Sequence, residues 1–260
     1  MKWQAVAVNT YREAIRDKVL YNLLIFALIL IGGSSLLATL TIVEQTKIIL
    51  DFGLASMNLF GVLMAIFLGI SLVSKEIEKK TLYTVLSKPI GRTEFLLGKY
   101  AGLLLTLAVN MTIMGIGLYL TFMFNQSRWG LSVWDINPKW MGAIFMIYME
   151  LALLTAVALL FSTFTTTTLA AIFTLAIYVM GHISGDLMKM GEKLDAWTGL
   201  LLKGIYYTLP NLSNFDIKGQ VAHGVNIAPS YFFYTTAYAL IYCTLLMGLS
   251  AFIFKRRDLK

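Results

Sequence analysis

The side chains that could carry out chemistry are few and scattered in this sequence. Gly91, Gly98 and Lys99 are of the types found in a phosphate-binding loop, but six residues separate the two glycines, and a tyrosine follows the lysine where serine or threonine is needed. The histidines, His182 and His223, lie far apart, and no cluster of His, Cys and acidic residues has the spacing of metal ligands. The pattern predicts no catalytic residue, no metal site and no cofactor held by this chain itself.

Glu150 is the one acidic residue that lies inside a long apolar run. An unpaired charge is costly in hydrocarbon, so such a residue is expected to be protonated, paired or close to water. Two interpretations stay open. Glu150 makes a polar contact inside the membrane, lining a path or a seam between subunits, or it is a helix-end residue in water.

The composition of the chain sets its class. Of 260 residues, 58% are hydrophobic and only 13% are charged, and the mean hydropathy is +0.74. Soluble domains carry about a quarter charged residues, so the chain is predicted to be a polytopic membrane protein. Its net charge of +7 does not point to nucleic acid, because the basic residues cluster at the ends of apolar runs.

Six apolar runs are long enough, at about 20 residues each, to cross the hydrocarbon. They lie near residues 20–42, 53–74, 100–124, 141–162, 168–186 and 231–254. Only a Thr-rich link without charge separates the fourth run from the fifth, and two spans joined by a tight turn fit this better than one continuous span. The prediction is an all-α membrane protein with six transmembrane helices, forming a single domain over residues 1–260.

Residues 1–19 are predicted to form an amphipathic helix with an aromatic-edged apolar face and a basic face, which is typical of helices that lie in the membrane interface. The alternative is a helix that simply extends the first span.

With both termini placed inside, 14 basic residues fall on the cytoplasmic side and 7 outside. This positive-inside bias predicts that both termini are cytoplasmic.

The largest external loop is predicted to cover residues 186–230. Within it, residues 194–207 are too short and too polar to span the membrane, and indicate an interfacial or re-entrant helix that stops at Pro210. Residues 210–216 are predicted to form an ordered turn. A loop of this length usually has a function, but packing as a lid over the spans is the alternative.

The central loop, residues 75–99, contains six basic and three acidic residues between two apolar runs. The pattern predicts a helix end, a short helix at residues 81–86 and a break at Pro89. Thr93 is the predicted N-cap of the next helix, with Glu94 in its first turn. A charged loop of this kind is suited to hold another protein at the cytoplasmic face.

Gly98 and Gly102, like Gly181 and Gly185, have the spacing of small residues at close helix contacts.

Several motifs resemble one known family. The central loop, from Glu76 through Lys80-Thr81-Leu82-Tyr83-Thr84-Val85-Leu86-Ser87-Lys88-Pro89-Ile90-Gly91-Arg92 to Gly98-Lys99, resembles the loop motif of type-2 ABC exporter permeases, although Lys80 stands where glycine is common. The closing Phe254-Lys255-Arg256-Arg257-Asp258-Leu259 resembles the tail of the same permeases. The Leu-Pro-Asn-Leu-x-x-Phe at residues 209–215 is similar to the subgroup linked to copper-enzyme maturation and gliding motility.

The resemblance implies a permease subunit in the cytoplasmic membrane of a prokaryote. Its implied partners are two separate ABC ATPase subunits, which bind ATP and Mg²⁺, a second copy of this permease or a related one, and membrane lipid, but no nucleic acid. The central loop would couple ATP hydrolysis to transport. The residues implied to contact the ATPase are Glu76, Glu78, Thr81, Leu82, Tyr83, Val85, Leu86, Pro89 and Arg92.

Two other function classes were weighed against this one. A secondary transporter or channel without an ATPase usually has several intramembrane ionisable residues, whereas this chain offers only Glu150. A membrane anchor for an enzyme complex would carry its partner contact on the external loop rather than on the central loop.

Overall fold

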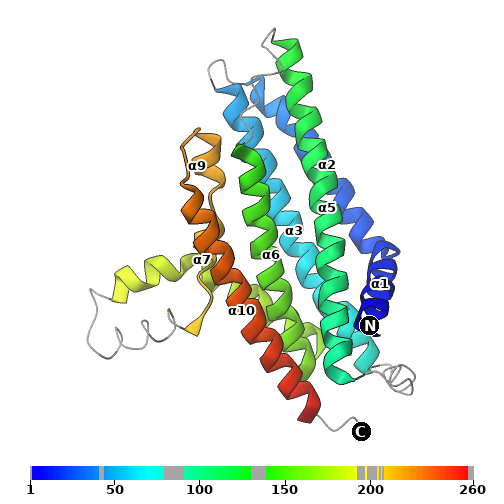
Figure 1. Cartoon of the computed structure of the whole chain (residues 1–260). Helices are drawn as coiled ribbons and strands as arrows, with labels where there is room; N and C mark the ends of the chain where they lie inside the picture. The colour runs from blue at the N-terminus through cyan, green and yellow to red at the C-terminus, as the bar shows by residue number, and fades with distance from the viewer. Residues whose placement is uncertain are drawn as a thin grey trace.

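The computed structural model describes residues 2–40, 44–78, 91–129, 139–191 and 208–256, with the single residues 197, 204 and 206. This part of the chain is helical and contains no strand (Figure 1). Its elements are α1 (Lys2–Ile15), α2 (Lys18–Ala38), α3 (Gln45–Glu78), α5 (Arg92–Arg128), α6 (Lys139–Phe164), α7 (Thr167–Gly191), the 3₁₀ helix η1 (Leu212–Phe215), α9 (Lys218–Ala222) and α10 (Pro229–Arg256).

Six of the described helices, α2, α3, α5, α6, α7 and α10, are long and apolar enough to cross a membrane. This confirms the prediction of an all-α membrane protein with six spans. The helices extend past the predicted runs, most clearly α5, which begins at Arg92 rather than near residue 100. Its 37 residues rise about 55 Å, well beyond a hydrocarbon core about 30 Å thick, so the helix continues after its apolar run ends.

Helix α6 lies at the centre of the bundle and contacts α3, α5, α7 and α10. All its residues from Glu150 to Leu160 are buried, as expected for a helix that is hydrophobic on every side. In Figure 1, α5 and α10 lie close together at the end of the bundle where both chain termini are found, and they diverge toward the opposite end. We call these the terminal end and the far end.

Helices α1 and α2 are separate elements, because the helical conformation is interrupted at Arg16 and Asp17. The side chain of Asp17 accepts a hydrogen bond from the Val19 N–H at 2.9 Å and caps α2. The interpretation of the N-terminal helix as an extension of the first span is therefore wrong. The predicted apolar face of α1 is the buried face, with Val6 and Ala14 enclosed, but it packs against α5.

Two local predictions have different outcomes. The fourth and fifth spans are indeed two helices joined by a tight turn, since α6 ends at Phe164 and α7 begins at Thr167. The predicted N-cap at Thr93 is wrong. Helix α5 is capped two residues earlier, at Gly91, whose backbone N–H donates to Glu94 Oε2 at 3.3 Å. The carboxylate predicted for the first turn does stand there, and it satisfies a backbone donor.

The segment between α7 and α10 returns to the bundle. Its η1 packs on α7 and α6, and its α9 packs on α3 and α6. The ordered turn predicted at residues 210–216 is confirmed, because Asn211 Oδ1 accepts hydrogen bonds from the backbone and hydroxyl of Ser213. Leu212 and Phe215 are fully buried, so the turn packs over the spans as a lid. The helix predicted at residues 194–207 falls mostly outside the described residues.

Candidate functional site

Helix α5 begins at Arg92, inside the predicted central loop, and its first turns hold the last helix of the chain. The Arg92 guanidinium donates to the carbonyl oxygens of Phe254 and Lys255, both at 3.1 Å. The last carbonyls of a helix have no partner within the helix and carry its negative partial charge, so a cation is favourable at this position. One turn further along, the fully buried rings of Phe95 and Phe254 stack with their centroids 6.3 Å apart.

The same stretch of α5 holds α1 on another face. A Cβ atom placed on Gly98 would lie 2.7 Å from the carbonyl oxygen of Trp3, and one on Gly102 would lie 2.5 Å from that of Ala7. Both distances are shorter than any ordinary contact of a side chain with backbone. The spacing of the two glycines thus marks a close helix contact, as predicted, and the partner is α1.

A buried cation lies between these glycines. The side chain of Lys99 is 2% exposed and its Nζ is 3.4 Å from Glu13 Oε2 of α1. The same ammonium group is 5.7 Å from the centre of the Phe95 ring, within the range of a cation–π contact. A buried charge whose partner is removed is strongly destabilising, so the Lys99–Glu13 pair fixes how α1 sits on α5.

We call the set of Arg92, Phe95, Gly98, Lys99 and Gly102 the α5 hub. It connects the helix that follows residues 79–90 to α1 on one side and to α10 on the other. These contacts are backbone approaches, a buried ring pair and charge-assisted bonds, so the helices cannot slide past one another without breaking them. A displacement of the start of α5 would therefore be passed to both terminal helices.

A second group of polar residues lies inside the spans. We call Asn58 of α3, Glu150 of α6, and Tyr178 and His182 of α7 the polar cluster. Asn58 Nδ2 donates to Glu150 Oε2 at 2.8 Å, and the Tyr178 hydroxyl donates to Asn58 Oδ1 at 3.0 Å. His182 Nε2 lies 3.4 Å from Glu150 Oε1. Glu150 is fully buried, so its interpretation as a helix-end residue in water is wrong.

The position of His182 constrains the protons of the cluster. Its Nδ1 lies 3.2 Å from the Tyr178 carbonyl oxygen, and a bond between these two atoms requires the hydrogen of a neutral ring to be on Nδ1. A bond between Nε2 and Glu150 Oε1 would then require one more proton, held by either group. With that proton the Glu150–His182 pair would have no net charge, which suits a site among apolar helices.

The segment between α7 and α10 covers this region. A Cβ atom placed on Gly181, next to His182, would lie 2.8 Å from the Pro210 carbonyl oxygen. Two tyrosines of α10 hold the same segment, since the backbone N–H of Asn211 donates to the Tyr238 hydroxyl and the Tyr231 hydroxyl donates to a nearby carbonyl. Gly181 thus admits the lid rather than another helix, which its spacing from Gly185 had suggested.

A salt bridge connects the end of the lid to α9, since Lys218 Nζ is 3.1 Å from Asp216 Oδ1. No group of three or more His, Cys, Asp and Glu residues in the described part of the chain could hold a metal ion.

The family model described as ABC-2 family transporter protein matches residues 5–259, nearly the whole chain. The chain belongs to this family. No curated protein matches it significantly. Members of the family are transmembrane subunits of ABC transporters, generally not catalytic themselves, and they associate with ABC ATPase subunits.

The hub accounts for several residues by which this ABC-2 permease resembles its family in sequence. Arg92, Gly98 and Lys99 close the loop motif, and Phe254 opens the tail motif. The structure joins the two motifs, because Arg92 binds the Phe254 carbonyl from 162 residues away. The second half of the loop motif thus contacts the permease's own helices.

Most residues predicted to contact the ATPase lie where the structure gives no side-chain position. Arg92 is the exception, and its guanidinium lies at the end of α10. Glu76 and Glu78 belong to the last turns of α3, but their side chains are not described. The others lie outside the described part of the chain: Thr81, Leu82, Tyr83, Val85, Leu86 and Pro89. Their role in the permease stays a prediction.

Sequence reasoning missed the partners of both sites. The positions of Asn58 and His182 relative to Glu150 depend on how α3, α6 and α7 pack, and each of these residues looks isolated in its own segment. Lys99 carried a usable signal, because a lysine between apolar residues on both sides, Phe95–Leu97 and the run that begins near residue 100, needs either water or an acid nearby. Glu13 of the amphipathic helix was such an acid.

Proposed function

We propose that this permease is one half of an ATP-driven exporter in the cytoplasmic membrane of a prokaryote. It would pair with a second copy or a related permease and with two separate ATPase subunits that bind ATP and Mg²⁺. The family match supports the class of transporter. The excess of basic residues at the terminal end supports a cytoplasmic location of both termini and of the central loop.

In this proposal residues 75–99 form the coupling element. Leu82, Tyr83, Val85 and Leu86 would be buried in a groove of the ATPase, and the surrounding charges would orient the loop and speed the encounter. The observation that carries the proposal is the α5 hub. Because the last residues of this loop are the first turns of α5, which contacts both α1 and α10, a displacement of the loop has a mechanical route into the spans.

We also place the permease in the subgroup linked to copper-enzyme maturation and gliding motility. The support is the Leu209–Phe215 sequence, which resembles that subgroup. In the structure this sequence forms the buried turn that caps the polar cluster, so it shapes the extracytoplasmic side of the bundle in the proposed topology. The export direction follows from the resemblance to type-2 exporters.

The first experiment tests whether the loop recruits the ATPase. Leu86→Asp and Tyr83→Ala should reduce the ATPase recovered with the tagged full-length permease from native membranes by about tenfold, which is about 1.4 kcal/mol of binding energy. The control is Val225→Asp, at an exposed position of the far end, which should leave recovery unchanged. Full ATPase recovery with both loop variants would show that the loop is only a charged connector.

A second experiment separates transmission from recruitment. Arg92→Ala removes the bonds to the end of α10 but leaves the apolar residues of the loop in place. We expect the ATPase to bind this variant normally and to hydrolyse ATP while no longer responding to the permease. Both bonds come from one nitrogen, Arg92 Nη1, so Arg92→Lys keeps a cation that can donate to the same carbonyls and should be milder than Arg92→Ala. Loss of ATPase binding with Arg92→Ala would instead place Arg92 in the ATPase contact.

A further inference from the structure

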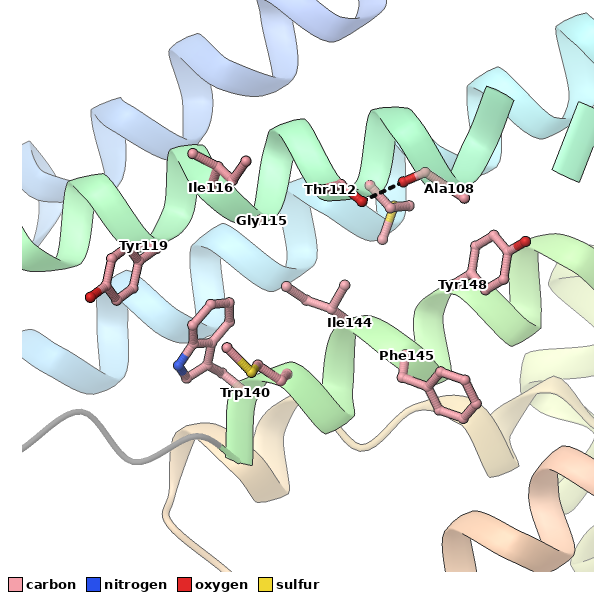
Figure 2. Close-up of a pocket in the computed structure, with 11 residues that line it drawn as sticks. Ala108, Thr112, Gly115, Ile116, Tyr119, Trp140, Ile144, Phe145 and Tyr148 are labelled. Carbon is pink, nitrogen blue, oxygen red and sulfur yellow. Dashed lines mark hydrogen bonds between the residues drawn. The ribbon is translucent and has the colours of Figure 1, made fainter. Parts of the chain in front are cut away.

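Two apolar grooves run along α5 on the side away from α1. The first lies between α5 and α6, with a volume of about 600 Å³, and Figure 2 shows Trp140 and Tyr119 at one end and Tyr148 at the other. The second, about 510 Å³, lies between α5, α6 and α10 nearer the terminal end. Tyr148 lines both grooves, so they meet at this residue.

The length of each groove matches half of a bilayer. The α5–α6 groove runs along α5 from Tyr119 to Ala108, which is about 16 Å at 1.5 Å per residue, or roughly half of the hydrocarbon thickness. The second groove continues along α5 from Leu104 to Thr93, again about 16 Å. The α5–α6 groove begins at a stacked Tyr119–Trp140 pair, with ring centroids 6.1 Å apart, and such residues mark the membrane interface.

Away from the Tyr119–Trp140 end, the hydroxyl groups on the groove walls already have hydrogen-bond partners. The Tyr148 hydroxyl of α6 donates to the Leu104 carbonyl of α5 at 3.3 Å, and the Tyr100 hydroxyl of α5 donates to the Ala152 carbonyl of α6 at 3.1 Å. The hydroxyl of Thr112, on the groove surface, donates to the Ala108 carbonyl of its own helix at 2.7 Å. Polar atoms that are already satisfied need no polar ligand, so the groove suits pure hydrocarbon.

We propose that the α5–α6 groove binds an acyl chain of a membrane lipid, with the headgroup beside Trp140 and Tyr119 and the chain end at Tyr148. The length and the aromatic end of the groove favour an acyl chain. The groove runs for about 16 Å along α5, the depth of one leaflet, and its outer end is the Tyr119–Trp140 pair, at the level expected for a headgroup. The proposal does not depend on ATP coupling or on the identity of the exported substrate.

The test uses the full-length permease in phosphatidylcholine vesicles containing a trace of phosphatidylcholine with a photoreactive diazirine in the middle of one acyl chain. After irradiation, mass spectrometry maps the labelled residues. We expect residues of α5 and α6 around Thr112 and Phe145 to be labelled at least fivefold more than Phe26 and Ile29 on the exposed face of α2. The α2 face is also apolar, and neither Phe26 nor Ile29 lines the α5–α6 groove, so it reports casual contact with lipid.

Groove-filling variants make the test specific. Thr112→Trp should reduce labelling of the groove about fivefold, whereas Ile113→Trp, on an exposed residue of α5 that does not line the groove, should not. Ala108→Leu is a smaller substitution that fills the same groove if the tryptophan prevents folding. Equal labelling of groove and α2, or labelling unaffected by filling, would overturn the proposal. So would an efficient disulfide between two copies carrying Thr112→Cys, which would assign the groove to a second permease.

Discussion

At the scale of single residues, Glu150 is the clearest case of a side chain whose partners decide its effect. Its carboxyl group is enclosed on all sides, bonded to Asn58 and paired with His182. Without those partners it would be a costly residue in the middle of a span. With them it connects α3, α6 and α7 through polar bonds, which specify one arrangement of helices more strictly than apolar contacts do.

This leads to a prediction for Glu150. Glu150→Leu leaves the Asn58 amide and the His182 ring without their partner, and should lower the free energy of unfolding by about 1–3 kcal/mol, the cost of an unsatisfied buried polar group. Glu150→Gln retains an acceptor for Asn58 and should be milder. The measurement is the thermal unfolding midpoint of the detergent-extracted permease.

The matched control for this prediction is Thr155→Val. Thr155 is equally buried on α6, but its hydroxyl bonds only to the Leu151 carbonyl of its own helix, so no other helix loses a partner. A double variant with Asn58→Leu should also cost less than the sum of the two single changes, because both remove the same bond. Additive costs, or a Glu150→Leu variant as stable as the native chain, would remove the cluster's structural role.

At the scale of elements, α5 is the helix on which the others are positioned. Its start holds α1 and α10, and its middle exchanges tyrosine hydrogen bonds with α6. Helix association in membranes depends on close packing because lipid tails offer as much apolar contact as another helix does. The glycines of α5 provide that close packing at the α1 contact.

The second prediction concerns this contact. Gly98→Leu puts a side chain where the Trp3 backbone lies, so α1 must move away, at a cost of about 1–3 kcal/mol if the change behaves like other overpacked sites. Arg12 lies on α1, and trypsin should cleave after it faster once α1 is displaced. Gly33→Leu is the control, because nothing lies within 4 Å of a Cβ at that position. Equal cleavage rates in the two variants would mean that α1 is held by other contacts.

The elements show which parts of this structure could be predicted from sequence and which could not. Apolar length identified the six spans, and the apolar periodicity of α1 identified its buried face. Local patterns of this kind leave partners open, however. Nothing around Arg92 specifies that its guanidinium binds carbonyls 162 residues away, and nothing around Gly181 specifies that a loop rather than a helix lies against it. Thr93 was a better side-chain cap than Gly91, but Glu94 supplied the cap from within the helix.

At the scale of the whole molecule, α5 and α10 are joined at one end of the bundle and separated by α6 toward the other. At the terminal end, Arg92 and Phe95 tie α5 to α10. Toward the far end the same two helices diverge (Figure 1) and the α5–α6 groove lies beside them. In such an arrangement, a tilt of α5 about the α5 hub moves its far end more than its start. Small displacements of the start of α5 would produce larger changes in the separation of α5 and α10 at the far end.

This arrangement has a function only if the terminal end faces the cytoplasm, where the ATPases are. Both chain ends and the start of α5 lie at that end (Figure 1), and 14 of the 21 basic residues were assigned to it. The prediction is tested in a Cys243→Ala background, which removes the single native cysteine. Single cysteines then replace Ser87 in the central loop, and Glu44 or Val225 at the far end.

A membrane-impermeant maleimide applied to whole cells should label Glu44→Cys and Val225→Cys, since both positions are well exposed. It should label Ser87→Cys only after the membrane is permeabilised. Glu44 serves as an independent check on Val225. Glu44 precedes α3 and Val225 follows α9, and these two helices pack together, so both positions must report the same face. Labelling of position 87 in whole cells would reverse the orientation of the bundle. The α5 hub would then face away from any cytoplasmic ATPase and could not transmit its movement.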